Sequence, residues 1–488
     1  MLQGGKRVSE IREHCGLCGI AGHRKEPVSL VAEGLLAMQH RGQEAAGILC
    51  AYEQGMKLHK RNGTVSEAMS DLPAYWSNLG IHAVIGHVRY GTCGGTDVIN
   101  AQPLLVRMAG IQVGIAHNGT ISNAFSLRQE LQNQGAIFMT NTDTEVVLHL
   151  MSRELKNTGF NVKKALEIAL RRLQGAYCFL IMTPEGLYAV RDPLGFRPLN
   201  LGRFQNGGWI IASETIAFSV CGATYVREIE AGEILFIANG VDELESERFS
   251  VDKELFSVRD GLAQCIFEHV YFARPGSYVF GDSVYSVRIA MGRQLAKEFP
   301  VQCDLVAPVP DSGMFAALGY ARELNLPFDM CFTRNHYIGR TFINPGSAQR
   351  AAMVMRKLQP IPEAVKGKRL CVVEDSIVRG TTSRARIRAL REAGAKEIHM
   401  RVCCPPHRYG CYFGIDFPEQ SELIARNYSV DEIANQLELD SLKYLSKDGM
   451  LGCVTAHDAD DYCTACFDGD YPVKPPVRDD SNQEGDAQ

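Results

Sequence analysis

"VVEDSIVRGTTS", residues 372–383, places two adjacent carboxylates, Glu374 and Asp375, between a β-branched run and a cluster of Gly and hydroxyl residues. The overlapping "RLCVVE" predicts a strand, and the following "SRARIRALREAG" predicts a helix. Unpaired N–H groups and the helix dipole favour a phosphate at a helix N-terminus. The carboxylates would repel phosphate and therefore need sugar hydroxyls or a Mg²⁺ ion. We interpret the stretch as a site for a phosphorylated sugar; two exposed acids beside a capped helix are the plainer alternative.

The same alternation of strand and helix extends over the chain from about Gly261. The predicted strands are "CDLVAPVP", "LPFDMCF", "KRLCVVE" and "EIHMRVCC", and helices such as "MFAALGYARELN" lie between them. This order predicts a parallel sheet, whose ligands bind at the loops that follow the strands. Gly394 is expected to end the helix after the acidic pair, and one of Thr381, Thr382 and Ser383 is expected to cap its start.

Bulk composition favours small-molecule chemistry. The chain has 488 residues, 45% of them hydrophobic, which is enough for two or three domains. A formal charge of -5 and a pI near 6.3 argue against nucleic-acid binding. No apolar stretch has the roughly 18 residues of a membrane span, and the charged N-terminus lacks a signal-peptide core. We therefore predict a cytoplasmic globular protein without membrane or nucleic-acid partners.

The first half of the chain mixes helices with short antiparallel strands. "AYCFLIMTPEGLYAV" predicts a hairpin, and "NVKKALEIALRRL" predicts a helix with one apolar face. Cys15, in "CGLCGIAGH", follows a charged leader. A cut before Cys15 would let its own α-amine act as the base that activates the thiol. Cys15 is therefore a candidate nucleophile, and a buried strand cysteine is the alternative.

Residues 372–383 resemble the phosphoribosyl diphosphate (PRPP) motif of the type I phosphoribosyltransferases. In that family the acidic pair, here Glu374 and Asp375, holds the ribose hydroxyls. The loop residues that the resemblance assigns to the 5-phosphate are Ser376, Val378, Arg379, Gly380, Thr381 and Thr382.

Two further segments fit this phosphoribosyl site. In "APVPDSG", the residues Asp311, Ser312 and Gly313 are candidates to cradle pyrophosphate, with Ser312, Glu374 and Asp375 near Mg²⁺. "RNHYIGRTFINPGSAQR", residues 334–350 with Arg340, predicts a mobile lid that clamps a polyanion; an ordinary basic loop is the alternative.

Four polar segments of the first half, "MQHRGQEAAGI", "GHVRYGT", "AHNGTISN" and "TNTDTEV", together resemble the class II glutamine amidotransferases. Those are N-terminal-nucleophile hydrolases with a four-layer αββα sandwich. The resemblance implies that Cys15 attacks the glutamine amide and that Asn118 and the Gly119 N–H form the oxyanion hole. It assigns glutamine binding to Arg41, Arg89, Thr92 and Asp143, with Arg89 on the α-carboxylate and Asp143 on the α-ammonium. Cys18 is left as a core residue.

Over nearly the whole chain, the two halves together resemble the amidophosphoribosyltransferases of purine biosynthesis. The resemblance implies that ammonia released from glutamine displaces pyrophosphate from PRPP, with the 334–350 lid sealing the passage. It also implies feedback by AMP and GMP and a homotetramer.

Sixteen cysteines in a cytoplasmic protein argue for buried thiols or metal ligands rather than disulfides. "DYCTACF" contains Cys463 and Cys466, a spacing that by itself indicates zinc, redox chemistry or nothing. Iron-sulfur members of the family have cysteines in the contexts of Cys265 and Cys411 as well, which implies a [4Fe-4S] cluster on these four. Zinc is the competing metal. The rival ligands are Cys403, Cys404 and Cys453, and the predicted core cysteines are Cys50, Cys178, Cys303, Cys331 and Cys371.

The predicted organisation has five parts. They are a cleaved propeptide at 1–14, a glutaminase domain at 15–250, a phosphoribosyltransferase domain at 261–440, a segment with cluster ligands at 441–475 and a disordered acidic tail at 476–488. Two other functions fit parts of this sequence. A PRPP-sensing regulator is disfavoured by the Cys15 constellation and the lack of a DNA-binding segment. A glutamine-dependent sugar-phosphate aminating enzyme would lack "VVEDSIVRGTTS".

Overall fold

The computed structural model describes residues 15–22, 25–90, 97–239, 243–251, 261–335, 358–415 and 420–475. The chain divides into two compact units. The N-terminal unit holds the described residues up to Gln264, the short segment Tyr412–Gly414 and residues 471–475. The C-terminal unit holds the described residues of Cys265–Cys411 and Ile415–Asp470.

Two antiparallel sheets form the centre of the N-terminal unit. The first has the strand order β11(Ala223–Glu228), β9(Asn200–Phe204), β10(Trp209–Ala212), β1(Gly16–Ala21), β4(Ala83–Arg89), β2(Ala45–Tyr52) and β3(Gly55–Asn62). The second has the order β13(Leu244–Arg248), β12(Glu233–Ala238), β8(Gly186–Arg191), β7(Gly175–Met182), β6(Ile111–Ile121) and β5(Leu104–Met108). The predicted hairpin is confirmed as β7 and β8, which pair antiparallel.

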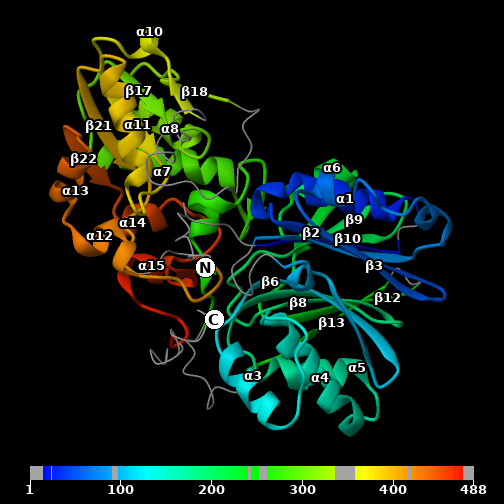
Figure 1. Cartoon of the computed structure of the whole chain (residues 1–488). Coiled ribbons are helices and arrows are strands. Elements are labelled where there is room, and N and C mark those ends of the chain that lie inside the picture. Colours follow the sequence, from blue (N-terminus) through cyan, green and yellow to red (C-terminus); the bar gives the residue numbers. More distant parts are fainter. Residues whose placement is uncertain are drawn as a thin grey trace, which may run out of the picture. The chain divides into compact units, whose positions relative to one another are not determined.

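Helices cover the outer face of each sheet, as Figure 1 shows within this unit. On the first sheet lie α1(Pro27–Ala37) and α6(Ile216–Cys221), and on the second lie α3(Ala124–Asn133), α4(Thr144–Asn157) and α5(Val162–Leu170). An apolar layer that includes Leu17, Ile85 and Leu180 fills the space between the sheets. Every residue of β7 is buried because both of its faces are covered. The predicted αββα sandwich is confirmed.

A parallel sheet forms the centre of the C-terminal unit. Its order is β17(Leu305–Pro308), β20(Arg369–Glu374), β21(Glu397–Val402) and β22(Ser441–Tyr444). The principal helices around it are α7(Val284–Glu298), α8(Met314–Leu324), α11(Thr381–Glu392) and α13(Val430–Gln436). Residues 441–475, set apart in the sequence analysis as a separate segment, thus begin with a strand of this sheet.

Two local expectations for the C-terminal unit are wrong. "LPFDMCF" forms no continuous strand: Phe328 makes one bridge to Val306, and β18(Phe332–Arg334) pairs with β19(Leu358–Pro360) in a separate small sheet. Pro327 has no N–H to donate, which interrupts the ladder. The N-cap of α11 is Gly380, at φ 75° and without a side-chain cap.

The remaining described elements are short. They are α2(Val65–Ala68), β14(Gln264–Cys265), β15(Tyr278–Val279), β16(Asp282–Ser283), α10(Pro362–Val365), α12(Ile424–Asn427), α14(Lys447–Leu451), β23(Tyr462–Cys463) and α15(Ala465–Asp468), together with a π-helical turn at Glu268–Phe272 and several short 3-10 turns. No helix among the described residues has the length and apolar character needed to cross a lipid bilayer.

Close contact between α7 and α8 depends on two glycines. A Cβ added to Gly292 would lie 1.9 Å from the Ala316 carbonyl oxygen, and one added to Gly319 would lie 2.2 Å from that of Ile289. The two helix backbones touch here, and a side chain would force them apart.

We expect Gly292→Ala to destabilise the protein by about 1–3 kcal/mol through this overpacking. The melting temperature should fall by roughly 2–4 °C for each kcal/mol. The control is Arg293→Ala, an exposed site on the same helix, which should leave the melting temperature near that of the parent. An unchanged melting temperature for Gly292→Ala would contradict the packing argument.

Candidate active site

Cys15 lies at the N-terminal end of β1, opposite the C-terminal end of β4. The two strands are antiparallel, with Gly16 opposite Val88, so Cys15 adjoins Arg89. Burial raises the pKa of the Cys15 thiol, while the Tyr90 backbone and the Arg89 charge favour the thiolate and the Asp143 charge opposes it. Arg89 and Asp143 therefore both act on Cys15. Because its pKa is raised, the thiol is protonated at rest and needs a base to become a nucleophile.

The predicted oxyanion residues lie on β6 of the second sheet. Asn118 is fully buried and donates from Nδ2 to the Ser213 hydroxyl at 3.4 Å. Ser213 also accepts the Leu17 N–H at 3.0 Å, so one hydroxyl links Asn118 to the strand that follows Cys15. Gly119 has φ +140°, and a Cβ there would lie 2.1 Å from the Ala176 carbonyl oxygen, so only glycine fits.

Asp143, at the start of α4, is held as a carboxylate. It accepts the Ile121 N–H at 3.0 Å, and His117 Nδ1 lies 3.4 Å from its other oxygen. Burial by itself would raise the pKa of Asp143, but His117 and the backbone N–H groups of Ile121 and Thr144 bring it below the usual value. An ionised carboxylate of this kind can bind an ammonium group.

A network of buried side chains supports β6 and was not identified from the sequence. The His117 N–H donates to Gln102 Oε1 at 2.7 Å, and His87 Nε2 donates to the His117 carbonyl at 3.0 Å. Burial lowers the pKa of His87 to about 3, so its ring is a neutral donor. His87 and His117 stand inside two of the polar segments, whereas Ser213 ends an apolar strand and has no motif around it.

The surroundings of Arg41 differ from those of the other predicted glutamine-binding residues, because its charge has a partner inside the unit. The guanidinium of Arg41 is buried and bonded to the buried carboxylate of Glu214, which His40 Nε2 also contacts at 2.7 Å. The stem of Arg41 packs 3.5 Å from where a Cβ on Gly16 would be. Arg41 thus supports the strand next to Cys15 while its charge is matched internally. Thr92 lies outside the described residues.

In the C-terminal unit, the loops that follow β17 and β20 meet. The Ser312 hydroxyl donates to Asp375, which also accepts the Ser376 hydroxyl at 2.5 Å. Burial raises the pKa of Asp375, and these two hydroxyls oppose that effect. The strands are parallel neighbours, so their carboxyl ends share one edge of the sheet. The structure therefore joins two predicted segments that are 63 residues apart at this contact.

The neighbouring acid, Glu374, has a different partner. Arg386 of α11 donates to it at 2.5 Å and the Ser383 hydroxyl at 3.4 Å. Arg386 was not predicted, although helical spacing places it one turn after the hydroxyl cluster. Ser312 and Asp375 supply the oxygen ligands that Mg²⁺ prefers, while Glu374 is bound to a guanidinium.

The other predicted PRPP-binding residues differ from one another in their surroundings. A Cβ on Gly313 would lie 2.4 Å from the Val373 carbonyl oxygen, so this turn also requires glycine. Asp311 pairs with Arg334, and Arg379 pairs with Glu422. Arg340 and the rest of residues 336–357 lie outside the described residues.

The four predicted cluster cysteines gather in the C-terminal unit. Cys265 is on β14 and Cys463 on its neighbour β23, and the Cys466 carbonyl accepts the N–H groups of Arg408 and Tyr409, just before Cys411. Burial raises the pKa of Cys466 well above its usual value, and the other three thiols and Cys404 add to this effect. Within the described residues no three potential ligands have the closer spacing of a formed metal site. The donor set itself, four thiols, fits iron-sulfur or zinc.

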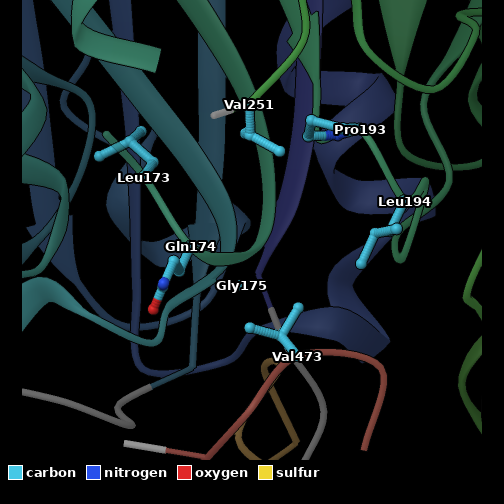
Figure 2. Close-up of a pocket in the computed structure, with 7 residues that line it drawn as sticks. All are labelled: Leu173, Gln174, Gly175, Pro193, Leu194, Val251 and Val473. Atoms are coloured by element: carbon cyan, nitrogen blue, oxygen red, sulfur yellow. The ribbon is translucent and has the colours of Figure 1, made fainter. Parts of the chain in front are cut away.

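A small pocket of the N-terminal unit lies apart from these residues (Figure 2). It is lined by Leu173, Gln174, Gly175, Pro193, Leu194, Val251 and Val473. The lining is mostly apolar and contains no predicted site residue, so we do not assign the chemistry to it.

Comparison with protein families supports the N-terminal assignment. A glutamine amidotransferase domain model matches residues 96–220. The amidophosphoribosyltransferase of Bacillus subtilis is 42% identical over 471 residues, covering 96% of this chain and 96% of the relative. That of Methanocaldococcus jannaschii is 42% identical over 467 residues, covering 94% and 98%. A chloroplastic relative from Glycine max is 45% identical over 466 residues, covering 95% and 79%.

Solved structures agree over nearly the full length. A structure described as the allosteric regulatory enzyme of purine biosynthesis has a TM-score of 0.86 at 42% identity, covering 95% of this chain and 97% of the other. The glutamine PRPP amidotransferase of B. subtilis complexed with ADP and GMP has a TM-score of 0.85 at 41% identity, covering 95% and 98%.

We expect Ser213→Ala to slow glutamine hydrolysis, because the hydroxyl fixes both Asn118 and the strand that follows Cys15. The change in kcat should be about tenfold, less than the 10²–10³ that follows removal of an oxyanion donor itself. The measurement is glutamate release at saturating glutamine. Ser77→Ala, which removes an exposed hydroxyl bonded only to the Ala74 carbonyl, should match the parent. Equal rates for both variants would refute the role of Ser213.

Proposed function

The chain belongs to the amidophosphoribosyltransferase family, and from this premise we propose how its residues divide the reaction. It is a glutamine-dependent glycosyltransferase of the first step of purine biosynthesis. Glutamine, PRPP and water yield 5-phosphoribosylamine, glutamate and pyrophosphate. One observation carries the assignment of residues: in each unit, polar groups that are far apart in sequence lie close together. They are Cys15, Arg89 and Asp143 in the N-terminal unit, and Ser312 and Asp375 in the C-terminal unit.

In the glutaminase reaction, Cys15 is the nucleophile. After removal of residues 1–14, its α-amine takes the thiol proton, Sγ attacks the side-chain amide carbon, and the proton passes to the leaving ammonia. Nδ2 of Asn118 and the N–H of Gly119 stabilise the oxyanion. Arg89 binds the α-carboxylate and Asp143 the α-ammonium of glutamine. Water then hydrolyses the thioester to glutamate.

In the transferase reaction, ammonia attacks C1 of the ribose and the C1–O bond to pyrophosphate breaks. Asp375 and Glu374 hold the ribose hydroxyls, the loop around Gly380 and Thr381 holds the 5-phosphate, and the turn of Ser312 and Gly313 holds pyrophosphate. When bound near Ser312 and Asp375, Mg²⁺ would neutralise charge on the departing pyrophosphate. The 334–350 segment is our candidate for excluding water from this step.

Replacing Cys15 by Ala should separate the two half-reactions. We expect glutamine-dependent pyrophosphate release to fall by at least about 10³-fold, because the nucleophile is lost. Release driven by ammonium ions should stay near the parental rate, because free ammonia bypasses Cys15. The assay follows pyrophosphate from PRPP and Mg²⁺. If the parent releases none with either nitrogen source, the proposed function fails.

We propose that Cys265, Cys411, Cys463 and Cys466 hold a [4Fe-4S] cluster with a structural role. The support is the gathering of these thiols around Cys466 and an apolar surrounding in which His407 stacks on Phe467 with ring centroids 4.7 Å apart. A zinc ion is the second candidate, because the same four thiolates would suit tetrahedral zinc.

The anaerobically purified protein should contain close to four iron and four sulfide per chain. Cys466→Ser should abolish this content and lower the melting temperature, because a ligand that joins α15 to the unit is lost. Cys453→Ser, a cysteine outside the proposed ligand set, should keep its iron. Zinc without sulfide in the parent would instead establish the second candidate.

Two further features of this enzyme, its regulation and its oligomeric state, are also proposed. The structure of the B. subtilis relative was determined with ADP and GMP, and we propose that purine nucleotides such as AMP and GMP inhibit this enzyme by feedback. We also propose a homotetramer. A cytoplasmic location stays a prediction from the sequence, and some relatives are chloroplastic.

A further inference from the structure

A three-residue segment from late in the chain, Tyr412–Gly414, belongs to the N-terminal unit. Phe413 is buried and stacks on Phe196, with ring centroids 4.5 Å apart at 24°. Tyr412 contacts Tyr471 edge to face at 5.2 Å. The Phe413 carbonyl accepts a hydrogen bond from Nη2 of Arg197 at 3.2 Å. This segment is thus part of the packed glutaminase unit, although it directly follows Cys411 in sequence.

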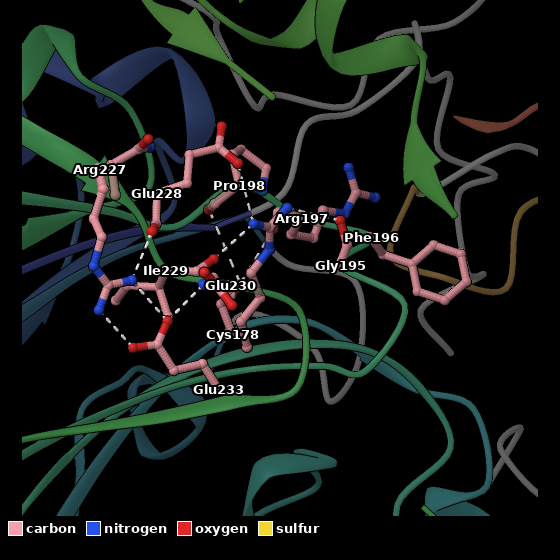
Figure 3. Close-up of polar contacts among 12 residues, drawn as sticks. Cys178, Gly195, Phe196, Arg197, Pro198, Arg227, Glu228, Ile229, Glu230 and Glu233 are labelled. Atoms are coloured by element: carbon pink, nitrogen blue, oxygen red, sulfur yellow. Dashed lines mark hydrogen bonds and ion pairs between the residues drawn. The ribbon is translucent and has the colours of Figure 1, made fainter. Parts of the chain in front are cut away.

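Arg197 lies in a loop, residues 191–198, whose backbone makes many polar contacts; Figure 3 shows Arg197 beside Gly195, Phe196 and Pro198 of this loop. Its carbonyl accepts the Arg191 Nε–H at 2.8 Å and lies 3.6 Å from the Cys178 sulfur. Arg191 also donates to the Gly195 carbonyl at 3.0 Å and the Ile229 carbonyl at 2.7 Å. Asp192 accepts the N–H of Leu194 at 3.0 Å. The loop 191–198 is therefore preorganised, and its Arg197 side chain is 1% exposed.

The segment reaches the oxyanion strand through Gly414. A Cβ added to Gly414 would lie 2.9 Å from Nη2 of Arg197 and 3.4 Å from the Cα of Gly119. Gly414 has φ +115°, which a side chain would strain. Gly414 therefore lies close to Gly119, with the guanidinium of Arg197 beside it, and there is little room for a side chain between them.

Loop 191–198 also supports Gly119 through a second neighbouring residue, Tyr177. Gly119 is paired with Tyr177 across β6 and β7. Asp192 donates its N–H to the Tyr177 carbonyl at 2.9 Å and accepts the Tyr177 N–H at 3.3 Å. Gly119 thus has Tyr177 as its strand partner and Gly414 as a close neighbour, and loop 191–198 positions both.

We propose that Arg197 is a positioning residue for glutamine hydrolysis: by seating Tyr412–Gly414 against Gly119, it orients the Gly119 N–H toward the oxyanion. The inference rests on the proposed role of Gly119. An oxyanion donor acts only in the transition state, so a tilt of this N–H lowers kcat and leaves ground-state binding of glutamine almost unchanged.

The test replaces Arg197 by Met, which keeps the length of the stem and removes the donors. We expect kcat for glutamine hydrolysis to fall by about 10- to 100-fold, below the loss of a whole oxyanion donor, with KM for glutamine within about twofold of the parent. Pyrophosphate release driven by ammonium ions should be unchanged. Arg197→Lys keeps one donor for the Phe413 carbonyl and should recover part of kcat.

Arg227→Met is the matched control. Arg227 is a more exposed arginine of this unit, bonded to Glu233 at 2.6 and 2.8 Å, as Figure 3 also shows. The Arg227→Met variant should lower the melting temperature and leave kcat and KM for glutamine unchanged. Gly414→Ala is the second test variant and should reproduce the loss of kcat, because its methyl group would lie 2.9 Å from Nη2 of Arg197 and displace the guanidinium, and the φ of +115° would strain the segment.

Three results would overturn the inference. They are a parental kcat in both Arg197→Met and Gly414→Ala, an equal loss of the glutamine-driven and ammonium-driven rates, and a raised KM at constant kcat. The first result would show that Arg197 has no positioning role. The second would show a general structural role, and the third would show a role in substrate binding. All three presuppose that the parent releases pyrophosphate, so a failure of the proposed function is recognised separately in the parental enzyme.

Discussion

The apolar layer between the two antiparallel sheets is the constraint on which the glutaminase site depends. Burial of residues such as Leu17 and Leu180 from opposite sheets holds the sheets face to face. Because the strand register is set by which residues face this layer, the ends of β1 and β4 come to the end of β6. The layer itself has no chemical function, yet it brings the strand that follows Cys15 within one hydroxyl of Asn118.

Buried polar groups at the edge of this layer form hydrogen bonds and ion pairs with partners inside the protein. Arg41 is bonded to Glu214, and Arg191 to backbone carbonyls of its own loop. An unpaired buried charge would cost several kcal/mol, so these pairs are a condition of the fold. They also make the site stiff. The groups that we propose to contact substrate, such as the Gly119 N–H, are thereby positioned by residues that never touch it.

The C-terminal unit positions its reactive groups with a parallel sheet instead. Its strands deliver polar residues to one edge, where the turn of Ser312 meets Asp375 and α11 begins at Gly380. Its acids have internal partners, since Arg386 bonds to Glu374. In both units the reactive groups are few, and most of the nearby polar residues serve to orient them.

The sequence by itself determined the fold class, the hairpin of β7 and β8, and the segments that contain Cys15, Asn118 and Asp375. Hydrophobic period and turn residues are local, so they can be read along the chain. The start of α11 was missed because Gly380 accepts a left-handed backbone that replaces a hydroxyl cap. The positions of Ser213 and Arg386 and the approach of Gly414 to Gly119 were decided only by the tertiary structure. Each is a contact between residues distant along the chain, and no local pattern encodes which side chains meet once two sheets and a returning segment have packed.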